Sequence, residues 1–379
     1  HDPRFIGNER KYLMDAMDSN FVSSVGEYVG KFEKAVAAYT GAGYAVAAVN
    51  GTSALHISLL LAGVEKDEEV ITQPVSFIAT CNAITYAGAH PVFVDVSLKT
   101  MGMCPEKLEA FLKENATRHP DGKTYNNKTG RRFAAVVPMH TFGHPCEIGR
   151  IAEICENYHI PLVEDAAESI GSFYKGKHTG LFGKLGAISF NGNKVITTGG
   201  GGMILTDDEE LAKRAKHITT TAKLPHRWEY RHDYTAYNYR LTNLAAALGC
   251  GQIEQLDFFI QEKRKLVEKY KAYFADKAEI TFFTEPEDCR SNYWLNAVIL
   301  KDRNARDEFL QYTNDHGIMT RPIWVLSNKL DMYRGCQCGD LSNAEWLEDR
   351  VVNIPSSVII KDYYRKISDP QFNPYHNLV

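Results

Sequence analysis

Apolar and polar residues are arranged in two different patterns along the first 247 residues. Short apolar runs such as Tyr44 to Val49 are typical of buried strands, and the segments between them carry apolar residues at helical spacing. We therefore expect strands at residues 44–49, 69–73, 91–96, 133–140, 161–165, 186–190 and 202–206. Helices are expected at residues 51–63, 76–89, 105–116, 147–159 and 207–218, the last of them with capping-box spacing between Asp207 and Glu210.

Strands that alternate with helices predict one large, mostly parallel sheet covered on both faces. In such sheets, ligands bind beyond the carboxyl ends of the strands. This rule selects the residues that follow each strand, namely Asn50 to Thr52, Phe77, His140, Asp165, and Ser189 to Lys194.

The pattern changes at about residue 248. Apolar residues from Ile253 to Tyr270 are spaced for one face of a long helix. The segments 292–300, 305–317, 318–324 and 346–356 that follow predict a smaller α/β domain. We expect a large α/β domain over residues 1–247, and a linking helix with a small C-terminal α/β domain over residues 248–379.

Composition narrows the class of protein. Of the 379 residues, 44% are hydrophobic and 24% are charged, which is ordinary for a globular protein. The formal charge of −4 gives no basic field for nucleic acid, and the apolar runs are too short to cross a membrane. No secretory signal is visible and the eight cysteines are scattered, so we expect a cytoplasmic protein without disulfides. Cys336 and Cys338 lack zinc-site spacing, and no metal is expected.

Lys194 lies in the stretch SFNGNKVITTGGGG, where glycine beside lysine suggests a phosphate loop. That pattern requires Ser or Thr after the lysine, and Val195 stands there instead. The remaining interpretations are an ordinary surface lysine and a lysine that forms a Schiff base with a carbonyl. The second needs a special setting, because freeing an ordinary lysine amine at pH 7 costs about 4 kcal/mol.

Other candidates fit the second interpretation, although each has a plainer explanation. Asp165 ends an apolar strand and could pair with the protonated ring nitrogen of pyridoxal phosphate, or could cap a helix. Gly51, Thr52 and Ser53 could bind a phosphate at a helix start, with help from Ser189, or could simply cap that helix.

Three aromatic or imidazole side chains complete the candidates. Phe77 could stack on an aromatic ring or belong to the core. His140 and His144 flank a loop glycine without an accompanying carboxylate, which favours a structural or substrate-contact role over a metal site. In chain order, the candidates are a turn that could bind phosphate, an aromatic residue that could stack on a ring, a carboxylate and a lysine.

Four motifs are specific as a set: NGTSALH from residue 50, VEDAAES from 163, SFNGNKVITTGGGG from 189 and YNYRLTN from 237. Together they resemble the DegT–DnrJ family of sugar aminotransferases, and the resemblance runs from Gly7 to Ser357. It implies a fold-type I pyridoxal phosphate-dependent transferase that acts on nucleotide-linked keto sugars with L-glutamate as the amino donor.

The resemblance also implies roles for single residues. Lys194 matches the cofactor-bound lysine, Asp165 the partner of the pyridine nitrogen, and Phe77 the ring stacker. The matched phosphate ligands are Gly51, Thr52, Ser53 and Ser189, with Asn238 reaching the phosphate in the neighbouring subunit of a homodimer. The segments matched to the sugar-nucleotide pocket are Phe21, Val22, Ser23 and Ser24, and Arg321, Pro322, Ile323 and Trp324.

Glu168 departs from the commonest family pattern, which has Gln or His near the cofactor's ring hydroxyl. A carboxylate there must be protonated or paired with a donor. The Glu version resembles the subgroup that aminates C4 of UDP-4-keto-6-deoxy-N-acetylglucosamine, and MHTFGHP and SNYWLN resemble its legionaminic-acid branch. The alternatives are a GDP-linked 4-keto sugar that gives perosamine, and a non-catalytic regulator. The glycines at 199–202 are expected to form a turn close to the cofactor.

Overall fold

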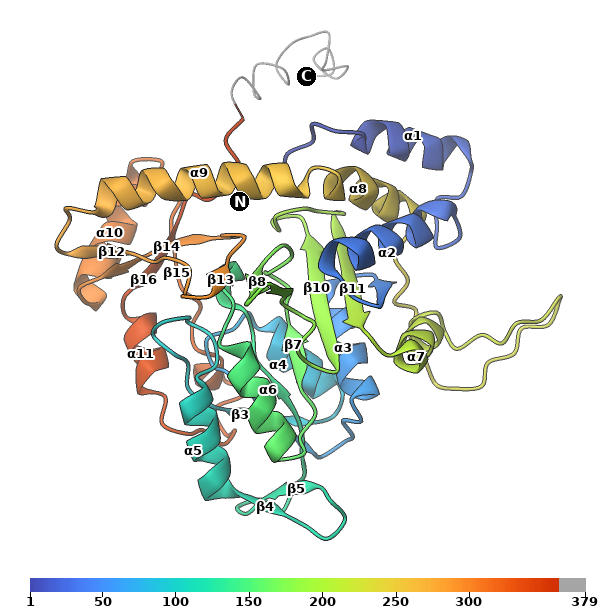
Figure 1. Ribbon diagram of the computed structural model, residues 1–379, viewed down its shortest axis with the longest axis horizontal. Coiled ribbons are helices and arrows are strands. Elements are labelled where there is room, and N and C mark those ends of the chain that lie inside the picture. Colours follow the sequence, from blue (N-terminus) through green and yellow to red (C-terminus); the bar gives the residue numbers. More distant parts are fainter. Residues whose placement is uncertain (361–379) are drawn as a thin grey trace.

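The apolar runs of the first half form a central sheet in the computed structural model, which describes residues 1–360 (Figure 1). Its seven strands, in spatial order, are β1 (Tyr44–Ala48), β11 (Gly200–Thr206), β10 (Leu185–Asn191), β7 (Val163–Asp165), β6 (Phe133–Val137), β2 (Glu69–Thr72) and β3 (His90–Phe93). Parallel bridges from Val136 to Leu162 and from Met139 to Asp165 join β6 to β7.

The prediction of a mostly parallel sheet is confirmed. β10 pairs in parallel with β7, and β2 pairs in parallel with β3 and β6. Of these seven strands, β11 alone runs in the opposite direction, antiparallel to both β1 and β10. Only the short stretch 192–199 joins β10 to β11, and such a connection is too short for a parallel crossover. Lys194 lies in this stretch.

The sheet buries both faces because successive side chains of a strand point to opposite sides. On β10 and β11, Ala187 and Ile204 pack toward one face, whereas Ile188 and Met203 pack toward the other. The first core includes residues of α3 (Gly51–Leu61), α4 (Ala79–Tyr86) and α7 (Glu209–Thr219), and the second those of α2 (Glu27–Thr40), α8 (Asn243–Ile253) and α9 (Leu256–Phe274). A further core holds α5 (Pro105–Asn115) and α6 (Ile148–Asn157) against β2, β3 and β6.

Two predicted helix boundaries are wrong. α7 is capped by Asp208, whose carboxylate accepts hydrogen bonds from the amides of Glu210 and Leu211, whereas Asp207 binds the amide of Gly43. The expected long helix forms as α9, but it begins at Leu256 and not at Ile253, which ends α8 before a break at residues 254–255. Apolar spacing continues across this break, so periodicity alone did not reveal it.

The C-terminal part builds a second, antiparallel sheet (Figure 1). Its order is β12 (Ile280–Phe282), β14 (Asn296–Leu300), β16 (Val351–Ile354) and β15 (Arg321–Pro322), accompanied by α10 (Arg303–Asp315) and α11 (Ser342–Glu348). One apolar core contains residues from both parts, including Phe190, Trp294 and Leu347. The division at residue 247 stays a prediction.

The remaining described elements are short, apart from one N-terminal helix. They are α1 (Glu9–Asp18), the paired strands β4 (Ala116–Arg118) and β5 (Thr124–Asn126), the three-stranded set β13 (Cys289–Arg290), β8 (Phe173–Tyr174) and β9 (Lys177–His178), and 3₁₀ turns at Thr141–Gly143 and Ser327–Lys329.

A segment near the C-terminus lies along the outer edge of β3. The amide of Phe93 donates to Gln337 and the carbonyl of Phe93 accepts from Gly339, at 2.9 and 2.8 Å. Nearby, the buried carboxylate of Asp95 accepts hydrogen bonds from the amides of Asn343 and Ala344. The unusual Cys336–Gln337–Cys338 sequence therefore has a structural place at the edge of the sheet.

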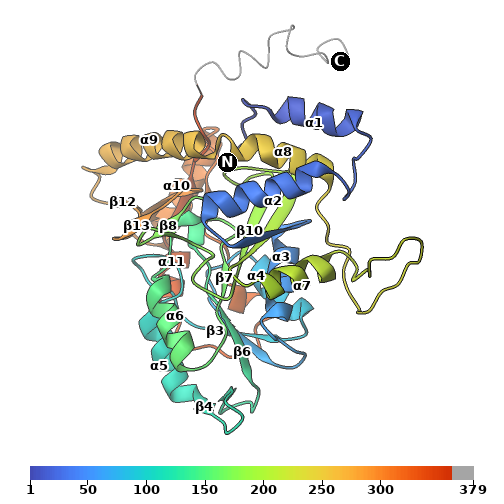
Figure 2. The same ribbon diagram turned by 45° about the vertical axis from the view of Figure 1, so that its right-hand side comes forward.

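An arm of residues 220–242, between α7 and α8, projects from the body in both views (Figures 1 and 2). Several of its aromatic residues are exposed, with Trp228 at 70%, Tyr230 at 80% and Tyr234 at 59%, whereas Tyr237 and Tyr239 are half-buried. Within residues 1–360, no helix is both long and apolar enough to span a membrane.

Candidate active site

The ends of two parallel neighbours, β7 and β10, bring the central candidates together. Asp165 ends β7 and lies opposite Ala187 of β10, two residues before Ser189. Just beyond β10, the amide of Lys194 donates to the carbonyl of Asn191 in a tight turn. The rule that ligands bind beyond strand ends therefore selected residues that share one edge of the sheet.

Asp165 is buried, with an exposed fraction of 4%. Its carboxylate accepts hydrogen bonds from the Thr80 hydroxyl at 2.5 Å and from the Ala167 amide at 3.2 Å. Burial raises the pKa of Asp165, although these two donors and the charge of Lys194 oppose the rise. Within the described residues it has no ion-pair partner, so a protonated ring nitrogen would supply the missing cation.

Lys194 points into the same region, and 11% of its side chain is exposed. Its Nζ lies 3.3 Å from Oε1 of Glu168 and 3.7 Å from the centre of the Trp294 ring. The indole Nε1 of Trp294 donates to the carbonyl of Asn193 at 2.6 Å. Lys194 is thus no ordinary surface lysine, because a carboxylate and an aromatic face enclose its amine.

Glu168 has both of the features expected of a carboxylate at this position. It is buried, and burial raises its pKa to about 7. One oxygen faces Lys194 and the other accepts a hydrogen bond from the Phe142 amide at 2.9 Å. Around neutral pH this group can hold or release a proton beside Lys194.

The start of α3 brings a second group of polar atoms next to the strand ends that carry Asp165 and Ser189. The Asn50 side chain caps the helix by accepting from the Ser53 amide at 2.8 Å. Among the described residues, the amides of Gly51 and Thr52 donate to no acceptor, so they are free for an anion. Ser189 lies directly beside them, since a Cβ on Gly51 would come within 2.7 Å of the Ser189 Cβ.

The glycine run has a different structure from the expected turn. Gly199 lies in the turn, but Gly200 and Gly201 already belong to β11, together with Gly202, where the strand was expected to begin. Gly202 pairs with Ser189, and a Cβ there would come within 2.3 Å of the Asn50 carbonyl oxygen. The close approach is therefore between β11 and the start of α3.

Aromatic rings lie near this region. Phe77 is 52% exposed, which excludes the core interpretation. The ring centre of Trp324 lies 6.4 Å from that of Phe77 and 5.0 Å from that of Phe142, whose amide binds Glu168. The rest of the 321–324 segment is divided, because Ile323 belongs to the core while Arg321 is exposed and binds Asn314 of α10. Pro322 is exposed in β15.

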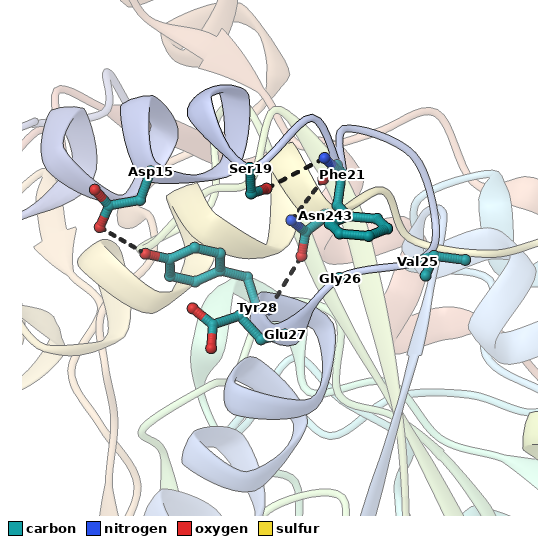
Figure 3. A pocket seen from close by; sticks show the side chains of 8 residues that line it. All are labelled: Asp15, Ser19, Phe21, Val25, Gly26, Glu27, Tyr28 and Asn243. Atoms are coloured by element: carbon teal, nitrogen blue, oxygen red, sulfur yellow. Dashed lines mark hydrogen bonds between the residues drawn. The ribbon is translucent and has the colours of Figure 1, made fainter.

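Of the segment Phe21 to Ser24, Phe21 lines a pocket of about 310 Å³ between α1 and α2 (Figure 3). Asn243 holds this pocket together, since its side chain accepts from the Tyr28 amide and donates to the Phe21 carbonyl, while its amide donates to Ser23. Within residues 1–360, no hydrogen bond or ion pair joins this segment to Lys194 or Asp165.

Across residues 1–360, no hydrogen bond or ion pair joins Lys194 to Asn238, which lies beside Tyr239 at the base of the arm. Asn238 is exposed on the arm, where its side-chain oxygen accepts from Arg240 at 2.9 Å. The roles of Asn238 and of the 21–24 segment stay predictions, as do the ligand roles of the residues around Lys194.

The histidine candidates have structural positions. His140 is buried, with Nε2 3.0 Å from Glu164 and Nδ1 accepting from the Cys146 amide. His144 is buried between the rings of Phe283 and Tyr293, and burial lowers its pKa to about 3. In the part of the chain that the structure describes, no three His, Cys, Asp or Glu side chains form a metal-binding group.

Sequence reasoning missed three residues that contact the candidate site residues. They are Thr80, Phe142 and Trp294. Thr80 is one helical turn beyond Phe77, and this proximity was the only available signal. Trp294 lies 100 residues beyond Lys194 and reaches it through tertiary packing that no local pattern records.

These residues fit pyridoxal 5′-phosphate. The free amides of Gly51 and Thr52, with the Ser189 hydroxyl, suit its phosphate, and buried Asp165 suits its ring nitrogen. Lys194 is in place for its carbonyl carbon. Fold and site together define a pyridoxal phosphate-dependent aminotransferase.

Comparison with known proteins gives the family. The chain matches the DegT/DnrJ/EryC1/StrS aminotransferase family over residues 4–364, and it belongs to that family. It is 36% identical to the GDP-perosamine synthase of Escherichia coli O157:H7 over 94% of this chain and 92% of that one. The GDP-perosamine synthase of Caulobacter vibrioides is 34% identical, over 93% and 91%.

A solved structure agrees with this assignment. The aminotransferase TlmJ from Streptoalloteichus hindustanus superposes with a TM-score of 0.85 at 27% identity, covering 95% of this chain and 93% of that one. The expected family, fold and cofactor are confirmed. The expected UDP-sugar and legionaminic branch is not supported, because the similar relatives above are named for a GDP-linked product.

Proposed function

We propose that this enzyme transfers an amino group from L-glutamate to C4 of a GDP-linked 4-keto-6-deoxy sugar, giving a perosamine-type product. The observation that carries the reaction class is the enclosed amine of Lys194 beside two buried carboxylates at one edge of the sheet. The choice of GDP is supported by two relatives, both named GDP-perosamine synthase, that align over more than nine-tenths of the chain.

The residues divide the chemistry between them. When bound, pyridoxal phosphate supplies an electron sink that makes the proton on the amine-bearing carbon acidic. Lys194 holds the cofactor at rest and, once free, moves that proton with its Nζ as general base and then general acid. Asp165 keeps a proton on the ring nitrogen, because its buried carboxylate is stabilised by a cation.

Other residues bind the phosphate, present a ring face or carry a proton. Ser189 and the amides of Gly51 and Thr52 bind phosphate at the start of α3, and Phe77 presents a ring face. Glu168 accepts or returns a proton beside Lys194, since its pKa of about 7 matches neutral pH. The ring face of Trp294 lies 3.7 Å from Nζ of Lys194 and holds that amine in place through a cation–π contact.

We infer that the working form is a homodimer with shared sites. The support is the projecting arm, which carries exposed Trp228 and Tyr230, and Asn238, which makes no hydrogen bond to Lys194 of its own chain within the described residues. Such a placement suits an asparagine that completes a phosphate site in a second copy.

The proposal is tested with purified enzyme, L-glutamate and a panel of GDP- and UDP-linked 4-keto-6-deoxy sugars, followed by mass spectrometry of the products. We expect amination of the GDP-linked sugar with formation of 2-oxoglutarate. Preferential amination of a UDP-linked N-acetylated sugar would instead support the subgroup that Glu168 resembles. Turnover of neither class would contradict the proposed substrate.

A further inference from the structure

Lys263 of α9 is a buried lysine that the proposed reaction does not use. Its exposed fraction is 0%, and its Nζ donates to two backbone carbonyls, those of Trp294 at 3.1 Å and Ser356 at 2.5 Å. Among residues 1–360 no carboxylate pairs with it, and burial lowers its pKa to about 7. An apolar side chain of similar length would fill this space without the cost of burying an amine.

The carbonyl that Lys263 binds belongs to the residue whose ring faces Lys194. Trp294 is held at three points, by Lys263 at its carbonyl, by the Asn292 side chain at its amide (2.8 Å), and by the Asn193 carbonyl at its indole N–H (2.6 Å). These bonds fix both the backbone and the ring plane. The ring centre then lies 3.7 Å from Nζ of Lys194.

The same framework holds the carboxylate on the other side of Lys194. The side-chain amide of Asn292 donates to the carbonyls of Glu168 and Ile170, at 2.8 and 2.9 Å. Glu168 and Trp294, which both contact the Lys194 amine, are thus tied to one segment. Asp165 and His140 are the further titratable groups that face this region among the described residues. Lys263 anchors the segment to α9 and to residue 356.

We propose that Lys263 is a positioning residue for Lys194, acting through Trp294. By holding the Trp294 carbonyl, it keeps the indole face against the Lys194 amine and so favours the ammonium form of that amine. The inference rests on the proposed function only in taking Lys194 as the reactive amine.

The first test measures Lys194 itself, without turnover. The full-length protein, stripped of cofactor, is labelled with trace acetic anhydride across a pH series, and acetylation of the Lys194 peptide is quantified by mass spectrometry. Loss of a cation–π contact should lower the midpoint of labelling in Lys263→Met by about half to one pH unit. The matched control is Lys265→Met on the same helix, whose exposed amine pairs with Glu262; it should leave the midpoint unchanged.

The second test asks whether the effect passes through the ring. Trp294→Leu should lower the midpoint by a similar amount, and adding Lys263→Met to it should give no further shift. An unchanged midpoint in folded Lys263→Met would overturn the proposal, and so would a full additional shift in the double variant.

A merely structural role is separated by thermal melting, which reports folding but not the Lys194 midpoint. If Lys263→Met does not fold, the same titration on Lys263→Gln decides. Its amide retains a donor, so a midpoint between wild type and Trp294→Leu supports the proposal. A midpoint equal to wild type together with lost Trp294 order, seen as altered indole fluorescence, contradicts it.

Discussion

At the scale of single residues, Lys194 and Glu168 share one proton environment. Glu168 is as buried as a core residue, yet it bears a carboxylate 3.3 Å from the Lys194 amine. Burial disfavours the charge on Glu168, whereas Lys194 and the Phe142 amide favour it. The balance leaves this group poised near neutral pH, where a small change in Lys194 alters its protonation.

Replacing Lys194 by Ala should abolish transamination while the fold persists. In the proposed mechanism the side chain is both the tether and the proton carrier, and loss of positioned acid–base catalysis alone lowers rates by about 10²–10⁴. We expect the visible absorbance of the lysine-bound cofactor to disappear and turnover to fall by at least about 10³-fold. Circular dichroism should be unchanged. Near wild-type turnover in this variant would exclude Lys194 from the mechanism.

Glu168→Gln should change how stability depends on pH in the cofactor-free protein. The pKa of Glu168 is raised to about 7 from 4.5, so its neutral form is favoured in the fold. The stability it contributes is complete below pH 4.5 and is lost as pH rises to about 7, a change of about 3 kcal/mol.

The variant has no carboxylate at this position, so it does not lose this stability. Its unfolding free energy, measured by urea denaturation, should therefore rise relative to that of wild type as the pH increases from 4.5 to about 7. The control is Glu153→Gln, which removes an exposed carboxylate of α6. A constant difference between Glu168→Gln and wild type across the range would contradict the buried, pH-sensitive carboxylate.

At the scale of elements, the sequence predicted what local periodicity determines. Each predicted strand of the central sheet forms, and the ends of β7 and β10 carry Asp165 and Ser189 as expected. It could not predict that the strand expected from Gly202 already begins at Gly200, because glycine normally disfavours a strand. The reason is tertiary, since Gly202 lies between Ser189 on β10 and the start of α3, where a side chain has no room.

Gly202→Ala should therefore destabilise the protein and weaken cofactor binding together. Its Cβ would come within 2.3 Å of the Asn50 carbonyl oxygen, so the start of α3 must move. Overpacking of this kind costs about 1–3 kcal/mol. The matched control is Gly200→Ala in the same strand, whose Cβ would meet only the Val49 carbonyl oxygen at 3.8 Å.

Thermal melting and titration with pyridoxal phosphate measure both effects. Gly200→Ala should resemble wild type in both measurements. If Gly202→Ala retains wild-type affinity and melting temperature, the close packing of β11 against α3 does not shape the proposed phosphate site at the start of α3.

At the scale of the whole molecule, no hydrogen bond or ion pair among the described residues joins Asn238 of the arm to Lys194. The sequence could place Asn238 in a motif, but the position of the arm depends on tertiary structure. The 21–24 segment was expected to line a sugar-nucleotide pocket. In the structure its first residue, Phe21, binds Asn243 through its carbonyl. A second copy is the simplest way for either to reach a complete site.

Shared sites predict complementation between two defective chains. Lys194→Ala and Asn238→Ala should each have little activity alone. After mixing under conditions that exchange subunits, a mixed dimer has one site with both native residues, so activity should approach about a quarter of wild type. Activity is assayed with glutamate and the preferred sugar, and dimer mass by light scattering. No recovery from confirmed mixed dimers would contradict shared sites.

The strand-like segment beside β3 has a consequence for how the chain is made. Asp95 and Asn343, which meet there, are 248 residues apart. A ribosome delivers the sheet long before it delivers the segment that covers its edge, and an uncovered edge can pair with other chains. The growing polypeptide therefore passes through a period in which the edge of β3 is uncovered, and this period ends only when residues 337–344, near the end of the described chain, have emerged. Premature termination before that point should yield aggregates rather than a shortened enzyme.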